Sequence, residues 1–348
     1  MQKTIAKIHL KHIRNNAQAF KAYTGKPLCA VVKANAYGHG AEEVVFALSG
    51  VAETFATSLI DEAKTIRLSA CGKDILVLTP PLTTEQTATA IEENFLITVP
   101  DYATAILVAN TAHALKKTAR VHFKVNTGMN RYGMNVQTLG KACTLFQKNG
   151  WVQPQGLYSH LYGNTLEQAQ RQRQRFLHAE QIAKNYFPNL LCHLSATYGA
   201  LLGKDYVFDM TRIGIGLYGY TPVGITAPFP LQKGMEVYAP VTATRKYLGG
   251  GAGYGNDLTD AFQGNSLSVL RVGYADGFLR TQQNGIDGYE QNANNLCMDA
   301  CVRVGKYKKG TLLPILTNAD ETARLTNTIS YEVLCAATRR AEFVFDYD

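Results

Sequence analysis

Cys29-Ala30-Val31-Val32-Lys33-Ala34-Asn35-Ala36-Tyr37-Gly38-His39-Gly40 is a short apolar strand pattern that ends on one lysine and continues into a turn rich in glycine and asparagine. If this run is buried, the ammonium group of Lys33 is poorly solvated, and its pKa is expected to fall toward that of a nucleophilic amine. Such a lysine can form a Schiff base with an aldehyde. The alternative is a lysine whose stem packs on a sheet while its charged end reaches water.

From residue 28 to about residue 220, short apolar runs alternate with longer amphipathic runs, as is typical of strand-helix units around a parallel sheet. Eight strands are predicted: Leu28–Val32, Thr54–Thr57, Ile75–Leu78, Phe95–Val99, Val121–Val125, Gly156–His160, Leu191–Leu194 and Arg212–Tyr218. Predicted helices between them include Ala41–Leu48, Thr84–Glu93, Tyr102–His113, Gln137–Gln147 and Glu167–Tyr186. Eight such units favour a closed (β/α)8 barrel over an open doubly wound sheet.

After Pro222, Pro228 and Pro230 the pattern changes. It predicts strands separated by Gly/Asn-rich turns, and one late helix that begins at Thr328 or Ser330, where a hydroxyl can cap it. These strands are Glu236–Thr244, Ser266–Val272, Cys301–Val304 and Thr311–Leu316. The sequence therefore predicts an α/β protein with an N-terminal TIM-like barrel over residues 10–225. Residues 1–9 are expected to pair with residues 226–348 in a second, mainly β domain.

A closed barrel places its chemistry at the carboxyl ends of its strands. Lys33 and His160 stand at two of these ends, Thr197 follows the seventh predicted strand, and Gly214–Gly219 close the eighth. The hydroxyl and the unhindered N–H groups there suit a phosphate. A lysine able to form a Schiff base opposite a phosphate cradle suggests pyridoxal 5'-phosphate (PLP).

Composition limits the remaining classes of function. The 348 residues are 46% hydrophobic and 18% charged, as in a globular protein. The sequence contains no run of about 18 apolar residues, so no membrane span is expected. Because no signal peptide is recognisable and the seven cysteines are scattered in mostly apolar segments, reduced thiols and a cytoplasmic location are expected. The spacing of Cys297 and Cys301, without a second pair, argues against zinc, and no metal is expected.

The formal net charge of +8 raises the possibility of a nucleic-acid partner or an anionic small molecule. The basic residues are spread along the chain, with one local concentration in Gln168–Arg175. Because this run continues with Phe176, Leu177 and Ile182 at roughly helical spacing, a solvated helix face is favoured over an RNA-binding arm. No nucleic-acid partner is expected.

The stretch Ala30–Gly40 resembles the cofactor-lysine motif of bacterial alanine racemases. The resemblance extends over nearly the whole chain through six further motifs in the same order. These are His122–Arg131, Phe208–Gly219, Gly253-Tyr254-Gly255, Val272–Gly277, Cys297-Met298-Asp299 and Thr328–Glu332. Seven ordered motifs across two domains are far more specific than a single glycine-rich loop.

The resemblance implies a PLP-dependent homodimer in which the β domain of one subunit completes the barrel site of the other. By that likeness Tyr254 and Met298 enter the partner's site. Racemisation removes the Cα proton on one face and returns one on the other, for which two opposed bases are suited. Lys33 matches the base for the D-face and Tyr254 the base for the L-face. His160 matches a histidine hydrogen-bonded toward that tyrosine.

The same likeness assigns the charged residues of the site. Arg212 matches an arginine that faces the pyridine nitrogen, and His193 a histidine bonded to that arginine. Arg131 is similar to an arginine that contacts the cofactor's phenolic oxygen and the substrate carboxylate. Lys124 matches a lysine that is carbamylated in many members, the alternative being a plain lysine in a strand.

The remaining matches concern the phosphate and the substrate. The residues similar to the phosphate-binding set are Tyr37, Thr197, Gly214, Ile215 and Tyr331. Met298, Cys297 and Asp299 match the substrate-carboxylate side. The chain departs from the family pattern at Ala196, where Asn is usual, at Ala300, where Gln is common, and at Asn126, which replaces a frequent Asp. Leu161-Tyr162 also stands where Phe-Ala is frequent.

The leading hypothesis is therefore a racemase that interconverts L-alanine and D-alanine and supplies D-alanine for peptidoglycan. A racemase of a larger or polar amino acid, such as serine or lysine, is the nearest alternative. A non-catalytic PLP-binding protein is disfavoured because similar single-domain barrels lack the Tyr254 and Met298 motifs. A fold-related decarboxylase is disfavoured because Arg212 stands where those enzymes typically place an acidic residue.

Overall fold

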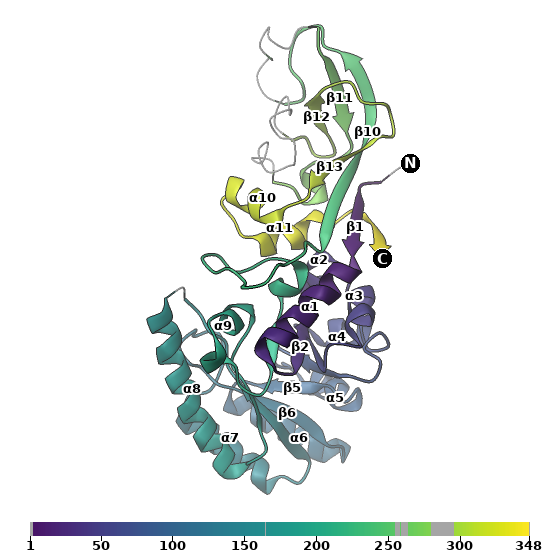
Figure 1. The fold of residues 1–348 in the computed structure, drawn as a ribbon. Coiled ribbons are helices and arrows are strands. Elements are labelled where there is room, and N and C mark those ends of the chain that lie inside the picture. The colour runs from purple at the N-terminus through teal and green to yellow at the C-terminus, as the bar shows by residue number, and fades with distance from the viewer. Residues whose placement is uncertain (1–2, 164, 255–257, 259–263, 280–295, 348) are drawn as a thin grey trace. The chain divides into compact units, whose positions relative to one another are not determined.

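The computed structural model describes residues 3–163, 165–254, 258, 264–279 and 296–347. The chain divides into two compact units (Figure 1). The barrel unit comprises Arg14–Ala34 and Ala41–Leu231. The β unit comprises Met1–Ile13, Asn35–Gly40 and Gln232–Asp348. No helix among the described residues is both long and apolar enough to cross a bilayer.

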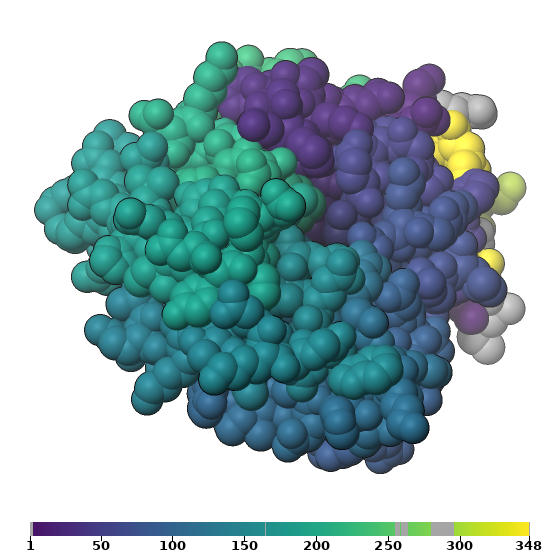
Figure 2. Space-filling view, turned by 90° about the horizontal axis from the view of Figure 1, so that it is seen from below, coloured from purple at the N-terminus to yellow at the C-terminus, as the bar shows by residue number. Residues whose placement is uncertain are grey.

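The barrel unit is built on eight parallel strands in the order β9-β2-β3-β4-β5-β6-β7-β8. Their bounds are β2 Leu28–Val31, β3 Thr54–Thr57, β4 Asp74–Val77, β5 Leu96–Val99, β6 Ala119–Lys124, β7 Val152–Tyr158, β8 Leu191–His193 and β9 Thr211–Ile213. Between the last two, Asp209 N donates to Cys192 O at 2.9 Å and Arg212 N to Ser195 O at 3.0 Å. Figure 2 shows the ring from below, with the chain's colours running round it until green lies beside purple. The predicted barrel class is confirmed.

Helices surround these strands. They are α1 Leu10–Thr24, which begins in the β unit, α3 Ala41–Leu48, α4 Ile60–Thr65, α5 Thr84–Glu92, α6 Tyr102–Leu115, α7 Val136–Lys148, α8 Leu166–Tyr186 and α9 Thr197–Leu201, with the 3-10 turns η1 Lys204–Tyr206 and η2 Ile215–Tyr218. Thr83, Asp101, Asn135 and Thr165 cap α5, α6, α7 and α8 by accepting a backbone N–H of the first turn. These caps, which the sequence displays, explain why the predicted starts of the four helices lie within one residue of the observed ones.

Two details of the predicted elements are wrong. The strand predicted over Arg212–Tyr218 ends at Ile213, because Gly214 leaves the extended conformation (φ −113°, ψ −92°) and a 3-10 turn follows. The hydroxyl cap expected for the late helix is absent, since α11 begins after Ile329, which makes no side-chain capping bond. Thr328 Oγ1 donates instead to the carboxylate of Glu332.

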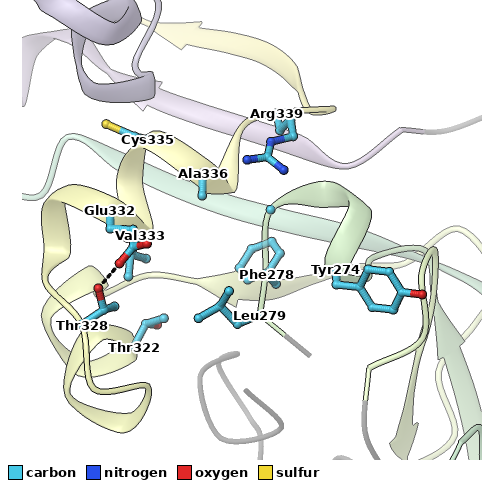
Figure 3. Close-up of a pocket in the computed structure, with 11 residues that line it drawn as sticks. Tyr274, Phe278, Leu279, Thr322, Thr328, Glu332, Val333, Cys335, Ala336 and Arg339 are labelled. Carbon is cyan, nitrogen blue, oxygen red and sulfur yellow. Dashed lines mark hydrogen bonds between the residues drawn. The ribbon is translucent and has the colours of Figure 1, made fainter. Parts of the chain in front are cut away.

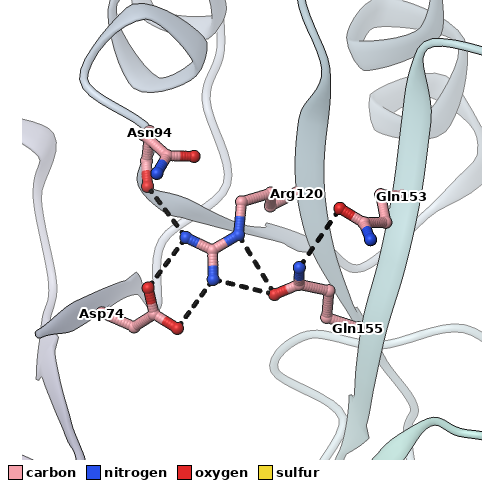
Figure 4. A network of polar contacts seen from close by, with 5 residues as sticks. All are labelled: Asp74, Asn94, Arg120, Gln153 and Gln155. Atoms are coloured by element: carbon pink, nitrogen blue, oxygen red, sulfur yellow. Dashed lines mark hydrogen bonds and ion pairs between the residues drawn. The ribbon is translucent and has the colours of Figure 1, made fainter.

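The interior of the barrel is polar along β6, where Arg120, His122 and Lys124 alternate with Val121 and Phe123. Arg120 forms a paired contact with both carboxylate oxygens of Asp74, on β4, at 2.8 and 2.7 Å, and donates to Gln155 Oε1, on β7 (Figure 4). These contacts join the strands away from their carboxyl ends. His122 and Lys124 lie successively nearer the carboxyl end of β6.

The β unit contains a sheet in the order β12-β11-β10-β1-β14, with β13 paired to β10. Its elements are β1 Ile5–His9, β10 Met235–Lys246, β11 Ser266–Leu270, η4 Tyr274–Asp276, β12 Cys301–Val304, β13 Leu312–Leu316, α10 Ala319–Leu325, α11 Ser330–Ala337 and β14 Glu342–Asp346. β1 pairs antiparallel with β10 and parallel with β14, so the expected pairing of the chain's start with the later strands is observed for Ile5–His9. The helix α10 is additional to the single late helix that the sequence predicts.

Candidate active site

Lys33 lies just after β2 and begins the element α2, Lys33–Gly38. This element is a left-handed turn, because Ala34, Asn35, Ala36 and Tyr37 have φ angles of 52°, 53°, 54° and 54°. Non-glycine residues in this region cost about 1–2 kcal/mol each, so the surrounding structure must hold the turn in place. Glu62 contributes by accepting Ala34 N at 2.8 Å. Lys33 itself is half-buried.

The end of the left-handed turn is fixed within the β unit. The buried His39 donates through Nδ1 to the carbonyls of Ala36 and Tyr37, both at 3.0 Å. Burial lowers the pKa of His39 to about 4, so the ring is neutral at pH 7. Tyr37 is buried with its ring 5.9 Å from that of Tyr331, and burial raises the pKa of Tyr331 to about 12. Both phenols therefore keep their protons and can donate hydrogen bonds.

Arg212, on β9, is 3% exposed and is held by four acceptors. Its Nη1 donates to His193 Nδ1 and to His193 O, both at 2.9 Å. Its Nη2 donates to Ser159 O at 2.6 Å and to Leu194 O at 3.2 Å. Burial lowers the pKa of Arg212, but an arginine remains a cation in proteins. A fixed buried cation therefore stands at the carboxyl end of the strands without a carboxylate among these four partners.

The bond from Arg212 determines the tautomers of two histidines. A guanidinium can only donate, so His193 Nδ1 must accept, and its Nε2 carries the proton. His193 Nε2 then donates to His122 Nδ1 at 2.9 Å, which leaves the proton of His122 on Nε2. Burial is the main cause that lowers the pKa of His122 to about 3 and that of His193 well below its ordinary value. Both rings are therefore neutral, and the chain of bonds crosses the interior from β9 to β6.

Two residues of this cluster were missed by sequence reasoning, His122 and Tyr158. The Tyr158 ring stacks on the His193 ring, with centroids 4.9 Å apart, and its hydroxyl bonds Thr98 Oγ1 at 2.8 Å. Lys124 Nζ lies 4.6 Å and Arg212 Cζ 5.2 Å from the Tyr158 ring centroid, so the ring contacts the guanidinium of Arg212 and the amine of Lys124. The alternation of polar residues along β6 was the signal that could have revealed His122.

Lys124 is 8% exposed at the end of β6, next to a loop that carries Arg131. Burial, with the charges of Arg212 and Arg131, holds the pKa of Lys124 well below its ordinary value. The loop is closed by Met134 N donating to Lys124 O at 2.9 Å and Asn126 N donating to Met134 O at 3.0 Å. The Asn126 side chain accepts Gly128 N at 2.9 Å and so organises the loop internally.

His160 lies two residues after β7, in the same cationic environment. Burial is the first cause that holds its pKa well below the ordinary value, and the charges of Arg212, Lys124, Arg131 and Lys33 add to it. The structure therefore brings Lys33, Lys124, Arg131, His160 and Arg212 into one electrostatic cluster. A neutral His160 can accept a proton or a hydrogen bond there.

A cradle of small groups lies between α9 and the turn that follows β9. Thr197 Oγ1 accepts Gly214 N and Gly216 N, both at 3.3 Å, and all three residues are buried. Ile215 is buried within the same turn. Ala196, the N-cap of α9, makes no side-chain capping bond, because alanine has no polar side-chain atom. Backbone N–H groups around a hydroxyl are suited to binding a phosphate.

The other predicted site residues belong to the β unit. Tyr254 and Met298 are exposed, at 64% and 54%, and Gly255 of the same motif lies outside the described residues. Gly273 packs so closely on the turn at 297–299 that a Cβ would approach the carbonyls of Cys297 and Met298 to 2.3 Å. The Asp299 carboxylate accepts Arg340 Nη1 at 2.7 Å. Asp299 is thus engaged in an ion pair, and Met298 is presented outward.

A hollow of about 490 Å³ also lies in the β unit (Figure 3). Its lining comes mainly from α11 and from the segment after η4, including Phe278, Leu279 and Val333. None of the predicted site residues lines it.

Each of the seven cysteines is in the described part of the chain and is a free thiol. The described residues contain no cluster of three or more His, Cys, Asp or Glu side chains that could hold a metal ion.

Family models and a curated relative show that the sequence is similar to alanine racemases. The family model described as "Alanine racemase, N-terminal domain" matches residues 8–222, and "Alanine racemase, C-terminal domain" matches residues 234–345. An alanine racemase of Francisella philomiragia is 30% identical over 288 residues, which cover 79% of this chain and 77% of that protein.

Solved structures show the same similarity. The alanine racemase from Streptomyces coelicolor has a TM-score of 0.87 and 26% identity, covering 99% of this chain and 98% of that one. An alanine racemase from Bartonella henselae with covalently bound pyridoxal phosphate has a TM-score of 0.84 and 22% identity, covering 99% of this chain and 100% of that one.

Proposed function

The chain belongs to the alanine racemase family, and we propose that it interconverts L-alanine and D-alanine with PLP as its cofactor. The observation that carries the proposal is the buried Arg212, bonded to His193 and three carbonyls, beside the cradle of Thr197 and Gly214. The proposal is supported because a permanent cation and a turn suited to a phosphate lie at the carboxyl ends of the strands, where Lys33 begins its own turn.

The residues present fit PLP. In β2 and β9, Cys29 pairs with Arg212 and Ala30 with Ile213, so the ends of these neighbouring strands adjoin. Lys33 would carry the cofactor's aldehyde carbon through its amine, and Arg212 would face the pyridine nitrogen. The N–H groups of Gly214 and Ile215, the Thr197 hydroxyl and the phenols of Tyr37 and Tyr331 would hold the phosphate. When bound, PLP supplies an electron sink that acidifies the Cα proton of an amino acid.

Racemisation needs a base on each face of the Cα atom. Once the substrate's amino group has replaced Lys33 on the cofactor, the freed Lys33 Nζ would remove or return the proton on the D-face. Tyr254 of the partner subunit would serve the L-face, in a homodimer whose sites are shared between subunits. The exposure of Tyr254 and Met298 in this chain supports a role at a partner's site. His160, held neutral by burial and nearby cations, would accept the hydrogen bond of the tyrosine and tune its basicity.

Arg212 would influence the reaction because it cannot protonate the pyridine nitrogen of the cofactor. A guanidinium stays protonated and cannot give a proton to the pyridine nitrogen. Arg212 would therefore leave the ring nitrogen without a proton, which would limit how far negative charge spreads from Cα and with it side reactions such as transamination. His193, fixed as an acceptor toward Arg212 and stacked on Tyr158, would hold the guanidinium in this orientation.

Arg131 would bind the substrate carboxylate, with Met298, Cys297 and Asp299 of the partner subunit lining that side.

We propose that Lys124 is carbamylated. Its pKa lies well below the ordinary value, so the neutral amine is available to attack CO2, forming an N–C bond and releasing one proton. The resulting carbamate anion would hold Arg131. Exchange of isotopically labelled bicarbonate into the protein, followed by NMR, would detect the carbamate, and an unlabelled Lys124 would contradict it.

The experiment that tests the proposed function is a panel of L-amino acids incubated with purified protein and PLP, with chiral analysis of the products. Alanine is expected to turn over fastest, and the α-proton is expected to exchange in deuterated water. Faster turnover of serine or lysine would overturn the assignment of alanine. The absence of any exchange would overturn the assignment as an enzyme. In the cell, we propose a cytoplasmic role in supplying D-alanine for peptidoglycan.

A further inference from the structure

The basic run Gln168–Arg175 has no part in the proposed reaction. It lies in α8, where residues four and seven apart share a face. Arg171, Arg175 and His178 therefore form one row, about 10 Å long at 1.5 Å per residue. Arg173 lies on another side and donates through Nε to Asp205 O. The structure thus divides the run into a row of three basic side chains and one arginine that is used elsewhere.

The row lines a hollow of about 580 Å³ on the barrel unit. The opposite side is the segment 125–136, which contributes Asn126 and Asn135, and Gln174 adds a third amide side chain. Buried Val125, Met134 and Ala179 form an apolar floor. The described residues that line the hollow include no Asp or Glu. The lining therefore combines excess positive charge with amide side chains, of which that of Asn126 also donates to Asn130 Oδ1 at 2.8 Å.

Two existing contacts of the row leave it able to bind an anion. Arg171 pairs with Glu167 one turn away, but both side chains are exposed, and exposed pairs of this kind are weak. Arg175 Nη1 donates to Thr127 O at 3.1 Å, which uses one of the five N–H groups of its guanidinium. Thr127 belongs to the loop that carries Arg131, so Arg175 also joins the hollow to that loop.

We propose that this hollow is a second binding site, outside the barrel mouth, for an anion of the phosphate class that carries more than one acidic group. Arginines are suited to oxyanions because the planar fork donates two parallel hydrogen bonds. The length of the row matches several acidic groups better than one, and the volume exceeds that needed by a single phosphate. The site is independent of the proposed reaction, since none of its lining residues is assigned a role there.

The test is calorimetric titration of the PLP-loaded protein with inorganic pyrophosphate, with potassium chloride and acetate at equal ionic strength as comparisons. Loading with PLP keeps the phosphate cradle at Thr197 from binding the probe. The protein is expected to bind pyrophosphate and to show no heat with the comparison salts. No saturable binding of pyrophosphate would overturn the proposal.

Variants locate the site. Arg171→Gln combined with His178→Gln is expected to weaken pyrophosphate binding at least tenfold. Arg173→Gln is the control on the same helix, because it removes one arginine that lies outside the hollow, and its affinity is expected to match the parent's. Unchanged binding in the double variant, or an equal loss in Arg173→Gln, would contradict the proposal. Circular dichroism and the visible absorbance of bound PLP confirm that each variant is folded.

Discussion

Thr197 provides a simple test of the phosphate cradle, because one oxygen atom accepts two backbone N–H groups, those of Gly214 and Gly216. Thr197→Val keeps the shape of the side chain but removes this acceptor. The variant also loses the hydroxyl proposed to donate to the phosphate, and a hydrogen bond to a charged group contributes about 1.5–3 kcal/mol, so PLP is expected to bind the variant at least about tenfold more weakly. The measurement is a PLP titration of the apoprotein followed by visible absorbance.

Thr197→Ser is the matched control, because it keeps the hydroxyl and should retain most of the affinity. If Thr197→Val binds PLP as tightly as Thr197→Ser, the cradle does not depend on this oxygen.

His122 predicts a measurable pH dependence of stability. Its pKa is about 3 in the folded chain and about 6.5 when unfolded, so below pH 6.5 the unfolded state binds the extra proton first. The contribution of His122 to the free energy of unfolding is therefore fully present above pH 6.5 and is lost progressively as the pH drops toward 3. By pH 5 the loss attributable to His122 is about 2 kcal/mol.

His122→Asn keeps an acceptor for His193 Nε2 without a titrating ring, and should flatten the free energy of unfolding between pH 7 and pH 5 by that amount. Urea unfolding at several pH values measures it, with the exposed His113→Asn as the control. Equal pH dependence in His122→Asn and the parent chain would contradict the account.

The candidate site was predictable where a residue sits in a recognisable motif, as Lys33, Arg131 and Arg212 do. His122 and Tyr158 were missed because their importance comes from contacts between strands that are distant in sequence. His122 lies on β6 and its partner His193 on β8, with β7 between them. The two rings meet on the inner face of the curved sheet, and no local sequence pattern shows that contact.

At the scale of an element, the left-handed turn after Lys33 carries a testable strain. Ala34 is exposed with φ of 52°, a region that glycine occupies without the penalty of a Cβ. Ala34→Gly is therefore expected to raise the free energy of unfolding by about 1 kcal/mol. Urea or thermal unfolding measures the change.

Ala114→Gly, at an exposed position of the right-handed helix α6, is the opposite control and should lower the free energy of unfolding by up to about 1 kcal/mol. A loss of stability in Ala34→Gly equal to that in Ala114→Gly would show that the turn carries no such strain.

Helices and strands whose ends carry clear turn signals were predictable from the sequence. Elements with a weak apolar pattern were not. Thr54–Thr57, Ala41–Leu48 and Cys301–Val304 agree in both bounds with the structure, since the two strands are mostly buried runs, the helix is amphipathic, and each has a turn signal nearby. The helix α10 was missed because its buried residues, Ala319, Thr322 and Ala323, are small and give no apolar stripe. The strand at Arg212 was predicted to continue through Gly214 and Gly216. In the structure these glycines lie after β9 and donate to Thr197 Oγ1, in the turn proposed to hold the phosphate.

At the scale of the whole molecule, the fold class was predictable because the eight strand-helix units and the later β-rich segment differ in periodicity. The shared-site homodimer stays a prediction with a direct test. Lys33→Ala and Tyr254→Phe should each be nearly inactive. If each site uses Lys33 of one subunit and Tyr254 of the other, mixed dimers have one intact site.

Unfolding and refolding the two variants together should therefore restore about a quarter of the parent activity, because half the dimers are mixed and each has one of two sites intact. Each variant refolded alone is the control. A mixture as inactive as the separate variants would place Lys33 and Tyr254 of the same subunit in one site.

The most direct test of the central claim is borohydride reduction of the PLP-loaded protein followed by peptide mapping. Reduction makes the bond between the lysine amine and the cofactor's aldehyde carbon permanent. The account predicts loss of the visible absorbance and one pyridoxyl-labelled peptide, with the label on Lys33. A label on another lysine, with Lys33 unmodified and Lys33→Ala still racemising alanine at the parent rate, would contradict it.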